Sequence, residues 1–141
     1  MLNIVKDRWV ECEKALKEKF RSMDIEKISY YDLVECTFRE ILDGELYEEI
    51  TEISTNSYQG TLVYVIPIGF ATTSDDFLIS YTNFGSCCAC DALEAIKYDL
   101  DCSNMSDTIA DLLALCREIA QNAKCPFARS YTDMRFLEAE F

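Results

Sequence analysis

Residues 61–68 have the sequence Thr-Leu-Val-Tyr-Val-Ile-Pro-Ile, and the expected architecture follows from their pattern. The run is rich in β-branched side chains and predicts a strand. One face would carry Leu62, Tyr64, Ile66 and Ile68, and the other Val63 and Val65. Because both faces are apolar, we expect this strand at the centre of a sheet. Pro67 must then lie at its end, since proline cannot donate a hydrogen bond within a ladder.

Two further strands are expected beside it. Residues 50–55 can form a strand before a turn at residues 56–60, and residues 77–83 can form another after a polar loop. Connections this short favour an antiparallel meander.

The N-terminal part of the chain has a helical period. Residues 3–21 carry an apolar stripe made of Val5, Trp9, Cys12, Leu16 and Phe20. A second helix is expected to begin at Ser29, which with Asp32 resembles a capping box. It should end at Asp43-Gly44, where glycine suits the left-handed C-terminal position.

Helices return after the sheet. A short one is expected at residues 91–98, and a long one should be capped by Ser106 and end at Cys125-Pro126. The tail is expected to fold back as a short strand or extended arm through Tyr131, Phe136 and Phe141. Apolar residues of this tail, namely Phe136, Leu137 and Phe141, suit a homodimer interface and a core equally well.

These elements predict an α+β fold, with a small antiparallel sheet of about three to four strands and helices packed on one face. The 141 residues fit one domain. Within it we expect an N-terminal helical pair (1–44), the strands (50–84), a cysteine turn with the C-terminal helices (85–125) and the tail (126–141).

The eight cysteines indicate a reducing compartment. The N-terminus becomes charged within six residues, unlike a signal peptide, and no apolar run approaches membrane-spanning length. We therefore expect a cytoplasmic protein without disulfides. Cys12, Cys36 and Cys116 fall on apolar helix faces and are predicted to be buried.

The charge is strongly acidic, with 26 acidic against 13 basic residues and a net charge of −13. Between residues 51 and 111 there are nine acids and only one base, Lys97. Such a field repels nucleic acid and anionic membranes and attracts basic surfaces, although solubility alone is an equally ordinary reason for it. We expect the acidic contact surface to include Asp75, Asp76, Asp99 and Asp101.

The stretch Phe84-Gly85-Ser86-Cys87-Cys88-Ala89-Cys90-Asp91 is the one part that a plain core does not require. A structural turn would have Gly85 and Ser86 at its bend, Asp91 or Ser86 capping the next helix, and half-buried thiols. A redox pair would use Cys87 as the attacking thiol and Cys90 as the resolving thiol.

Two other functions of the turn remain open. A zinc site could use Cys87, Cys88 and Cys90 with Cys102 or Cys125, but the chain has no histidine and no second Cys-x-x-Cys pair. Alternatively, the amides from Gly85 to Asp91 could hold an anion or a nucleotide phosphate. Because the chain also lacks a Ser–His or Cys–His pair and a phosphate-binding glycine loop, we expect neither an enzyme nor a resident cofactor.

Two segments resemble a known family. They are Tyr58-Gln59-Gly60-Thr61-Leu62 with the apolar run to Pro67, and Tyr81-x-x-Phe84-Gly85-Ser86-Cys87-x-x-Cys90-Asp91-Ala92-Leu93. They are similar to a family of small uncharacterised bacteriophage and mobile-element proteins, in which the turn is typically Tyr-Gly-Ser-Cys-Ser-Gly-Cys-Asp. Here Phe84 replaces the tyrosine and Cys88-Ala89 replaces Ser-Gly. The resemblance spans about residues 50–141 and implies a phage origin and no particular activity.

The leading functional hypothesis is a phage accessory protein acting in the host cytoplasm. It would bind and inhibit a basic, nucleic-acid-handling host protein, such as a CRISPR effector or another defence nuclease, by mimicking a phosphate backbone. One alternative is a module that sequesters a small nucleotide signal at residues 85–91. The other is a metal or redox protein that uses Cys87 and Cys90.

Overall fold

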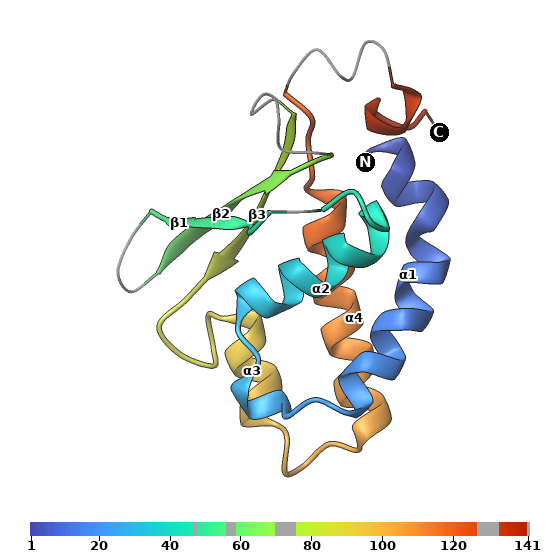
Figure 1. Ribbon diagram of the computed structural model, residues 1–141. Coiled ribbons are helices and arrows are strands. Elements are labelled where there is room, and N and C mark those ends of the chain that lie inside the picture. Colours follow the sequence, from blue (N-terminus) through green and yellow to red (C-terminus); the bar gives the residue numbers. More distant parts are fainter. Residues whose placement is uncertain (47, 56–58, 70–75, 127–132, 141) are drawn as a thin grey trace.

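The computed structural model describes residues 1–46, 48–55, 59–69, 76–126 and 133–140, and these form an α+β fold (Figure 1). The helices are α1 (Asn3–Arg21), α2 (Tyr30–Leu42), α3 (Ala92–Tyr98) and α4 (Met105–Gln121), and the strands are β1 (Thr51–Ser54), β2 (Gly60–Pro67) and β3 (Phe77–Phe84). Short 3₁₀ helices occur at Ile25–Lys27 and Met134–Phe136. The expected fold class is therefore confirmed.

The sheet has the order β1-β2-β3 within the described residues, and both pairs are antiparallel. The central place predicted for residues 61–68 is thus confirmed, and Pro67 is the last residue of β2, opposite Phe77. Tyr64, Ile66 and Leu78 are fully buried on the inner face. The helices lie on that side of the sheet (Figure 1).

The first helix matches the expected range and buries the whole predicted stripe. It packs beside α2 and α4, and α4 also contacts β3. Ser80 of β3 donates a hydrogen bond of 2.6 Å to the Ile119 carbonyl, which fixes α4 against the sheet. None of the described helices is long and apolar enough to cross a membrane.

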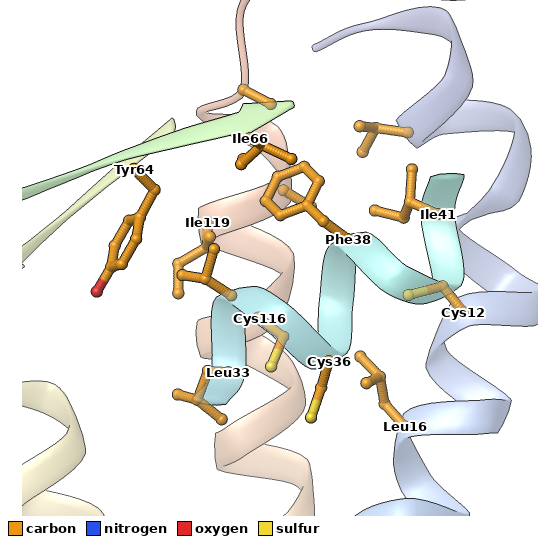
Figure 2. Close-up of a cluster of buried hydrophobic side chains, with 14 of the residues drawn as sticks. Cys12, Leu16, Leu33, Cys36, Phe38, Ile41, Tyr64, Ile66, Cys116 and Ile119 are labelled. Carbon is orange, nitrogen blue, oxygen red and sulfur yellow. The ribbon is translucent and has the colours of Figure 1, made fainter. Parts of the chain in front are cut away.

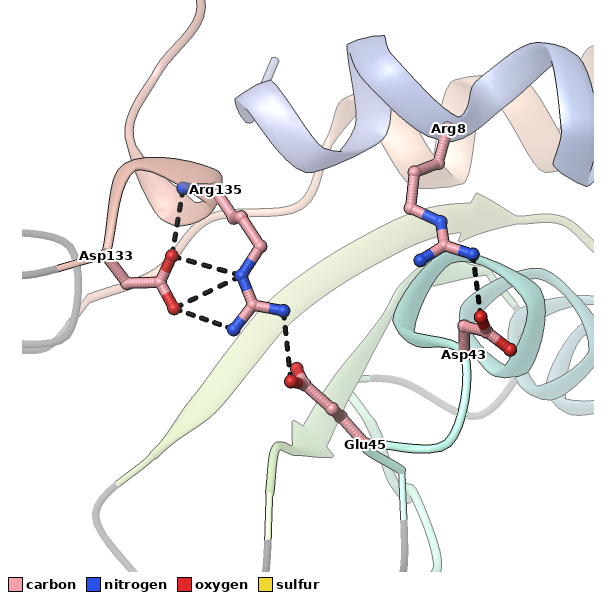
Figure 3. A network of polar contacts seen from close by, with 5 residues as sticks. All are labelled: Arg8, Asp43, Glu45, Asp133 and Arg135. Carbon is pink, nitrogen blue, oxygen red and sulfur yellow. Dashed lines mark hydrogen bonds and ion pairs between the residues drawn. The ribbon is translucent and has the colours of Figure 1, made fainter.

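The ends of α2 follow the local signals. Ser29 and Asp32 form a complete capping box. At the C-terminal end Asp43 takes a left-handed conformation with φ of 40°, followed by Gly44 at 90°. The left-handed conformation that ends α2 therefore begins one residue before the glycine. The Asp43 carboxylate lies 3.1 Å from the guanidinium of Arg8 in α1 (Figure 3).

The predicted bounds of the last helix are wrong at both ends. Asn104 rather than Ser106 is the N-cap, because its side-chain oxygen accepts the Asp107 amide at 2.8 Å and its amide group donates back to the Asp107 carboxylate. The helix stops at Gln121, before Cys125-Pro126. Lys124 instead exchanges two backbone hydrogen bonds, of 2.9 and 2.8 Å, with Ile79 of β3.

The core lies between the sheet and the helices, and Figure 2 shows Phe38 and Ile41 of α2 facing it. Cys12, Cys36 and Cys116 are buried as predicted, where α1, α2 and α4 pack together. Burial raises the pKa of Cys12 and of Cys116 to about 12 and also raises the pKa of Cys36. These three side chains therefore stay as neutral thiols that fill space.

The tail folds back onto the N-terminus, and the prediction of a short strand or extended arm is confirmed only beyond the 3₁₀ helix, where Glu138 forms an antiparallel bridge with Leu2. Phe136 is buried, so it serves the core, whereas Tyr131 and Phe141 lie outside the described residues. The Asn3 amide donates to the Leu137 carbonyl at 2.8 Å. Arg135 bonds Asp133 and also Glu45, which ties the tail to the segment after α2 (Figure 3).

Replacing Phe38 by alanine should lower the free energy of unfolding by about 3–5 kcal/mol, because its fully buried ring leaves a cavity. Val10, which is 63% exposed on α1, is the control, and Val10→Ala should change stability by less than about 0.5 kcal/mol. Urea unfolding followed by circular dichroism measures both. Equal effects of the two substitutions would contradict the described core.

Candidate functional site

One buried carboxylate organises the passage from β3 to α3. Asp91 is only 6% exposed. One of its oxygens accepts the Gly85 amide at 2.9 Å, and the other accepts the Glu94 amide at 3.1 Å and the Tyr30 hydroxyl at 2.7 Å. Asp91 is thus the N-cap of α3, which was one of the two caps expected from the sequence.

Tyr30, at the start of α2, completes this anchor. Its hydroxyl oxygen accepts the Leu93 amide at 3.1 Å while the hydroxyl donates to Asp91. Burial raises the pKa of Tyr30, and the hydrogen bond to Asp91 adds to the effect. We define Tyr30 and Asp91 with these bonds as the Tyr30–Asp91 anchor.

The anchor bears on the predicted anion site at residues 85–91. The amides of Gly85 and Glu94 already bond the Asp91 carboxylate. A nucleotide phosphate would have to displace that negative charge, and α3 has only seven residues to offer a dipole. The geometry therefore favours a turn closed by its own carboxylate.

The cysteine turn itself projects into solvent. Ser86, Cys87, Cys88 and Cys90 are exposed, so the expectation of half-buried thiols is wrong. The Cys90 amide donates to the Cys87 carbonyl at 3.1 Å, which closes a four-residue turn, and the sulfur atoms of these two residues lie 3.4 Å apart. The thiol of Cys87 lowers the pKa of Cys90 by hydrogen bonding to it, with smaller contributions from the Cys87 backbone and Ser86.

Metal binding at the turn finds no support in its geometry. In the part of the chain that the structure describes, no three cysteine or carboxylate side chains converge as metal ligands. Cys102 is exposed in the segment between α3 and α4, and Cys125 is half-buried beyond α4. Neither joins Cys87, Cys88 and Cys90 in a four-thiolate arrangement.

A cavity of about 310 Å³ lies between the start of α2, the sheet and α3. Its charged lining combines Lys27 and Lys97 with Glu52 and Glu94, next to the Tyr30–Asp91 anchor. Glu52 accepts the Tyr64 hydroxyl at 2.7 Å, and burial together with this bond raises the pKa of Tyr64. Since the cavity mixes both signs of charge, it gives no preference for an anion.

The predicted acidic surface separates into different environments. Asp75 lies outside the described residues, and Asp76 is half-buried just before β3. Asp99 and Asp101 are exposed immediately after α3. Among the described members, Asp99 and Asp101 are therefore the exposed pair that can form a contact surface.

A groove between α3 and α4 was not anticipated from the sequence. It measures about 370 Å³, and Asp99, Asp111 and Glu118 line it together with small and apolar side chains, namely Ala92, Ala95, Ile96, Ala114 and Leu115. We call this the acidic groove. Its signal in the sequence is the spacing of Asp111, Ala114 and Glu118, which places them on one face of a helix.

A scan against protein-family models, a search of curated proteins and a search of solved structures found no match for this chain. The phage-family resemblance therefore stays a prediction, and function has to be argued from the geometry.

Tyr30→Phe should lower the free energy of unfolding by about 1–3 kcal/mol, because the buried Asp91 carboxylate and the Leu93 amide each lose a partner. Tyr98→Phe is the matched control, since Tyr98 is 75% exposed, and should be nearly neutral. Urea titration of both variants measures the difference. An unchanged stability of Tyr30→Phe would show that the anchor does not hold the two helices together.

Proposed function

We propose that this protein works by binding a partner protein with a basic surface, and that the acidic groove makes the contact. The observation that carries the proposal is the combination of a small, apolar floor with three carboxylates in one hollow. The floor offers area to bury, and the carboxylates select basic side chains.

The small side chains of the floor matter for the kind of partner. Ala92, Ala95 and Ala114 leave room for an apolar side chain from outside to approach the backbones of both helices. Burying that side chain would supply affinity. Lysine or arginine residues beside it would then face Asp99, Asp111 and Glu118, so the fitting segment is basic and amphipathic.

Long-range charge supports the same type of partner. The net charge of −13 speeds encounter with a basic surface and repels anionic ligands. Asp101 and Asp107 are exposed close in sequence to the groove residues and extend the negative surface. A solvent-exposed rim of this kind acts mainly on the rate of association, while the floor acts on the lifetime of the complex.

A nucleic-acid-handling protein is the class of partner that fits best, because its basic surface is built to hold phosphates. Occupying that surface would exclude the nucleic acid and inhibit the partner. A defence nuclease of the host, such as a CRISPR effector, is the specific partner to expect if the chain is of phage origin.

Asp111→Lys with Glu118→Lys should abolish or weaken partner binding at least roughly tenfold, because both side chains line the groove. Glu11→Lys with Glu18→Lys is the matched control. It makes the same change in charge at the same seven-residue spacing on the exposed face of α1. The measurement is retention of proteins from a bacterial lysate, identified by mass spectrometry, with thermal unfolding to verify that both variants fold.

The wild type and the α1 variant should retain the same nucleic-acid-binding protein, and added DNA or higher salt should release it. If both variants lose that protein, its retention depends on the overall negative charge of the chain and not on the acidic groove. Retention by the groove variant, or the absence of any such protein from the wild type, would overturn the proposal.

A further inference from the structure

Cys87 and Cys90 are positioned to form a bond with each other. Both thiols are exposed, and their sulfur atoms are 3.4 Å apart. The hydrogen bond from the Cys90 amide to the Cys87 carbonyl closes a turn whose end Cα atoms lie within about 7 Å, and disulfides span about 4.4–6.8 Å. Since a disulfide bond is about 2.0 Å long, the sulfurs need to approach by only about 1.4 Å.

Gly85 allows Cys90 to lie close to the backbone that enters the turn. A Cβ atom at position 85 would lie 2.5 Å from both the carbonyl oxygen and the sulfur of Cys90. Because the first of these is a backbone atom, any side chain at position 85 would push the turn itself aside. The Gly85 amide in turn donates a hydrogen bond to Asp91 of the Tyr30–Asp91 anchor. This bond holds the start of the cysteine turn in place.

We infer that Cys87 and Cys90 form a reversible dithiol–disulfide pair that exchanges with low-molecular-weight disulfides such as glutathione disulfide. In the first step the Cys90 thiolate attacks one sulfur of the disulfide, which forms a mixed disulfide and releases one glutathione thiolate. In the second step the Cys87 thiolate attacks the Cys90 sulfur and releases the second glutathione. The two cysteine thiols are oxidised to one disulfide, and one glutathione disulfide is reduced to two glutathione thiols, which take up the two protons.

Cys90 is assigned the attack because the Cys87 thiol hydrogen-bonds to it and lowers its pKa. The lower pKa increases the fraction of reactive thiolate at neutral pH. This assignment is the opposite of the hypothesis drawn from the sequence, in which Cys87 attacks and Cys90 resolves. No carboxylate of the acidic groove takes part, so this inference is independent of the proposed partner binding.

The turn contains its own control in Cys88, an exposed thiol between the two partners. The reduced full-length protein is incubated without oxygen in glutathione buffers of increasing disulfide content, quenched with acid and alkylated. Intact mass and peptide mapping then identify every disulfide and adduct. Circular dichroism confirms that Cys87→Ser, Cys88→Ser, Cys90→Ser and Gly85→Ala variants are folded.

The wild type and Cys88→Ser should both lose two hydrogens and form the Cys87–Cys90 disulfide at the same buffer ratio. Cys87→Ser should stop at a glutathione adduct on Cys90, and Cys90→Ser should react at least roughly tenfold more slowly at this turn. Gly85→Ala should require a more oxidising buffer, because the pair is displaced. A disulfide that uses Cys88, or wild-type protein that stops at the adduct or stays reduced at every ratio, would overturn the inference.

Discussion

The Asp91 carboxylate is the interaction on which the candidate surfaces depend. A buried charge is tolerated only when donors surround it, and Asp91 receives three from three parts of the chain: Tyr30 of α2, Gly85 after β3, and Glu94 in α3. These bonds hold the start of α3 against the helical layer and the end of the sheet at once. A helix of seven residues is not stable by itself in water. The position of α3 therefore depends on this carboxylate, on the burial of Leu93 and on packing against α4.

The elements that the sequence predicted well are those fixed by local periodicity. The stripe from Val5 to Phe20 repeats at helical spacing, and Ser29 with Asp32 satisfies a helix start with two side chains three residues apart. The central strand was predictable because a continuous apolar, β-branched run is typical of a strand with a neighbour on each side, and β2 pairs with both β1 and β3. Where two local signals competed, the prediction failed: Asn104 and Ser106 both suit an N-cap, and only the hydrogen bonds to Asp107 distinguish them.

The candidate site was predicted only in part, because its geometry depends on contacts between distant residues. Tyr30 and Asp91 are separated by 61 positions, and no local pattern marks Tyr30 as more than another apolar residue of α2. The same holds for the end of α4, where pairing of Lys124 with Ile79 takes over from helical hydrogen bonds. The acidic groove also requires α3 and α4 to lie side by side, although Asp111, Ala114 and Glu118 already share a face by their spacing.

The number of acidic residues in a sequence is larger than the number of carboxylates that are free to act at the surface. Of the acids between residues 51 and 111, Asp91 is buried and accepts hydrogen bonds inside the fold, and Glu52 accepts a hydrogen bond from the Tyr64 hydroxyl. Such carboxylates stabilise the fold and are costly to remove, whereas Asp99 and Asp111 face solvent at the groove. Exposed carboxylates contribute little to stability, so their number is not explained by folding. Because the two sets of carboxylates are separate, Asp111 and Glu118 can be substituted without disturbing the anchor that holds α3 in place.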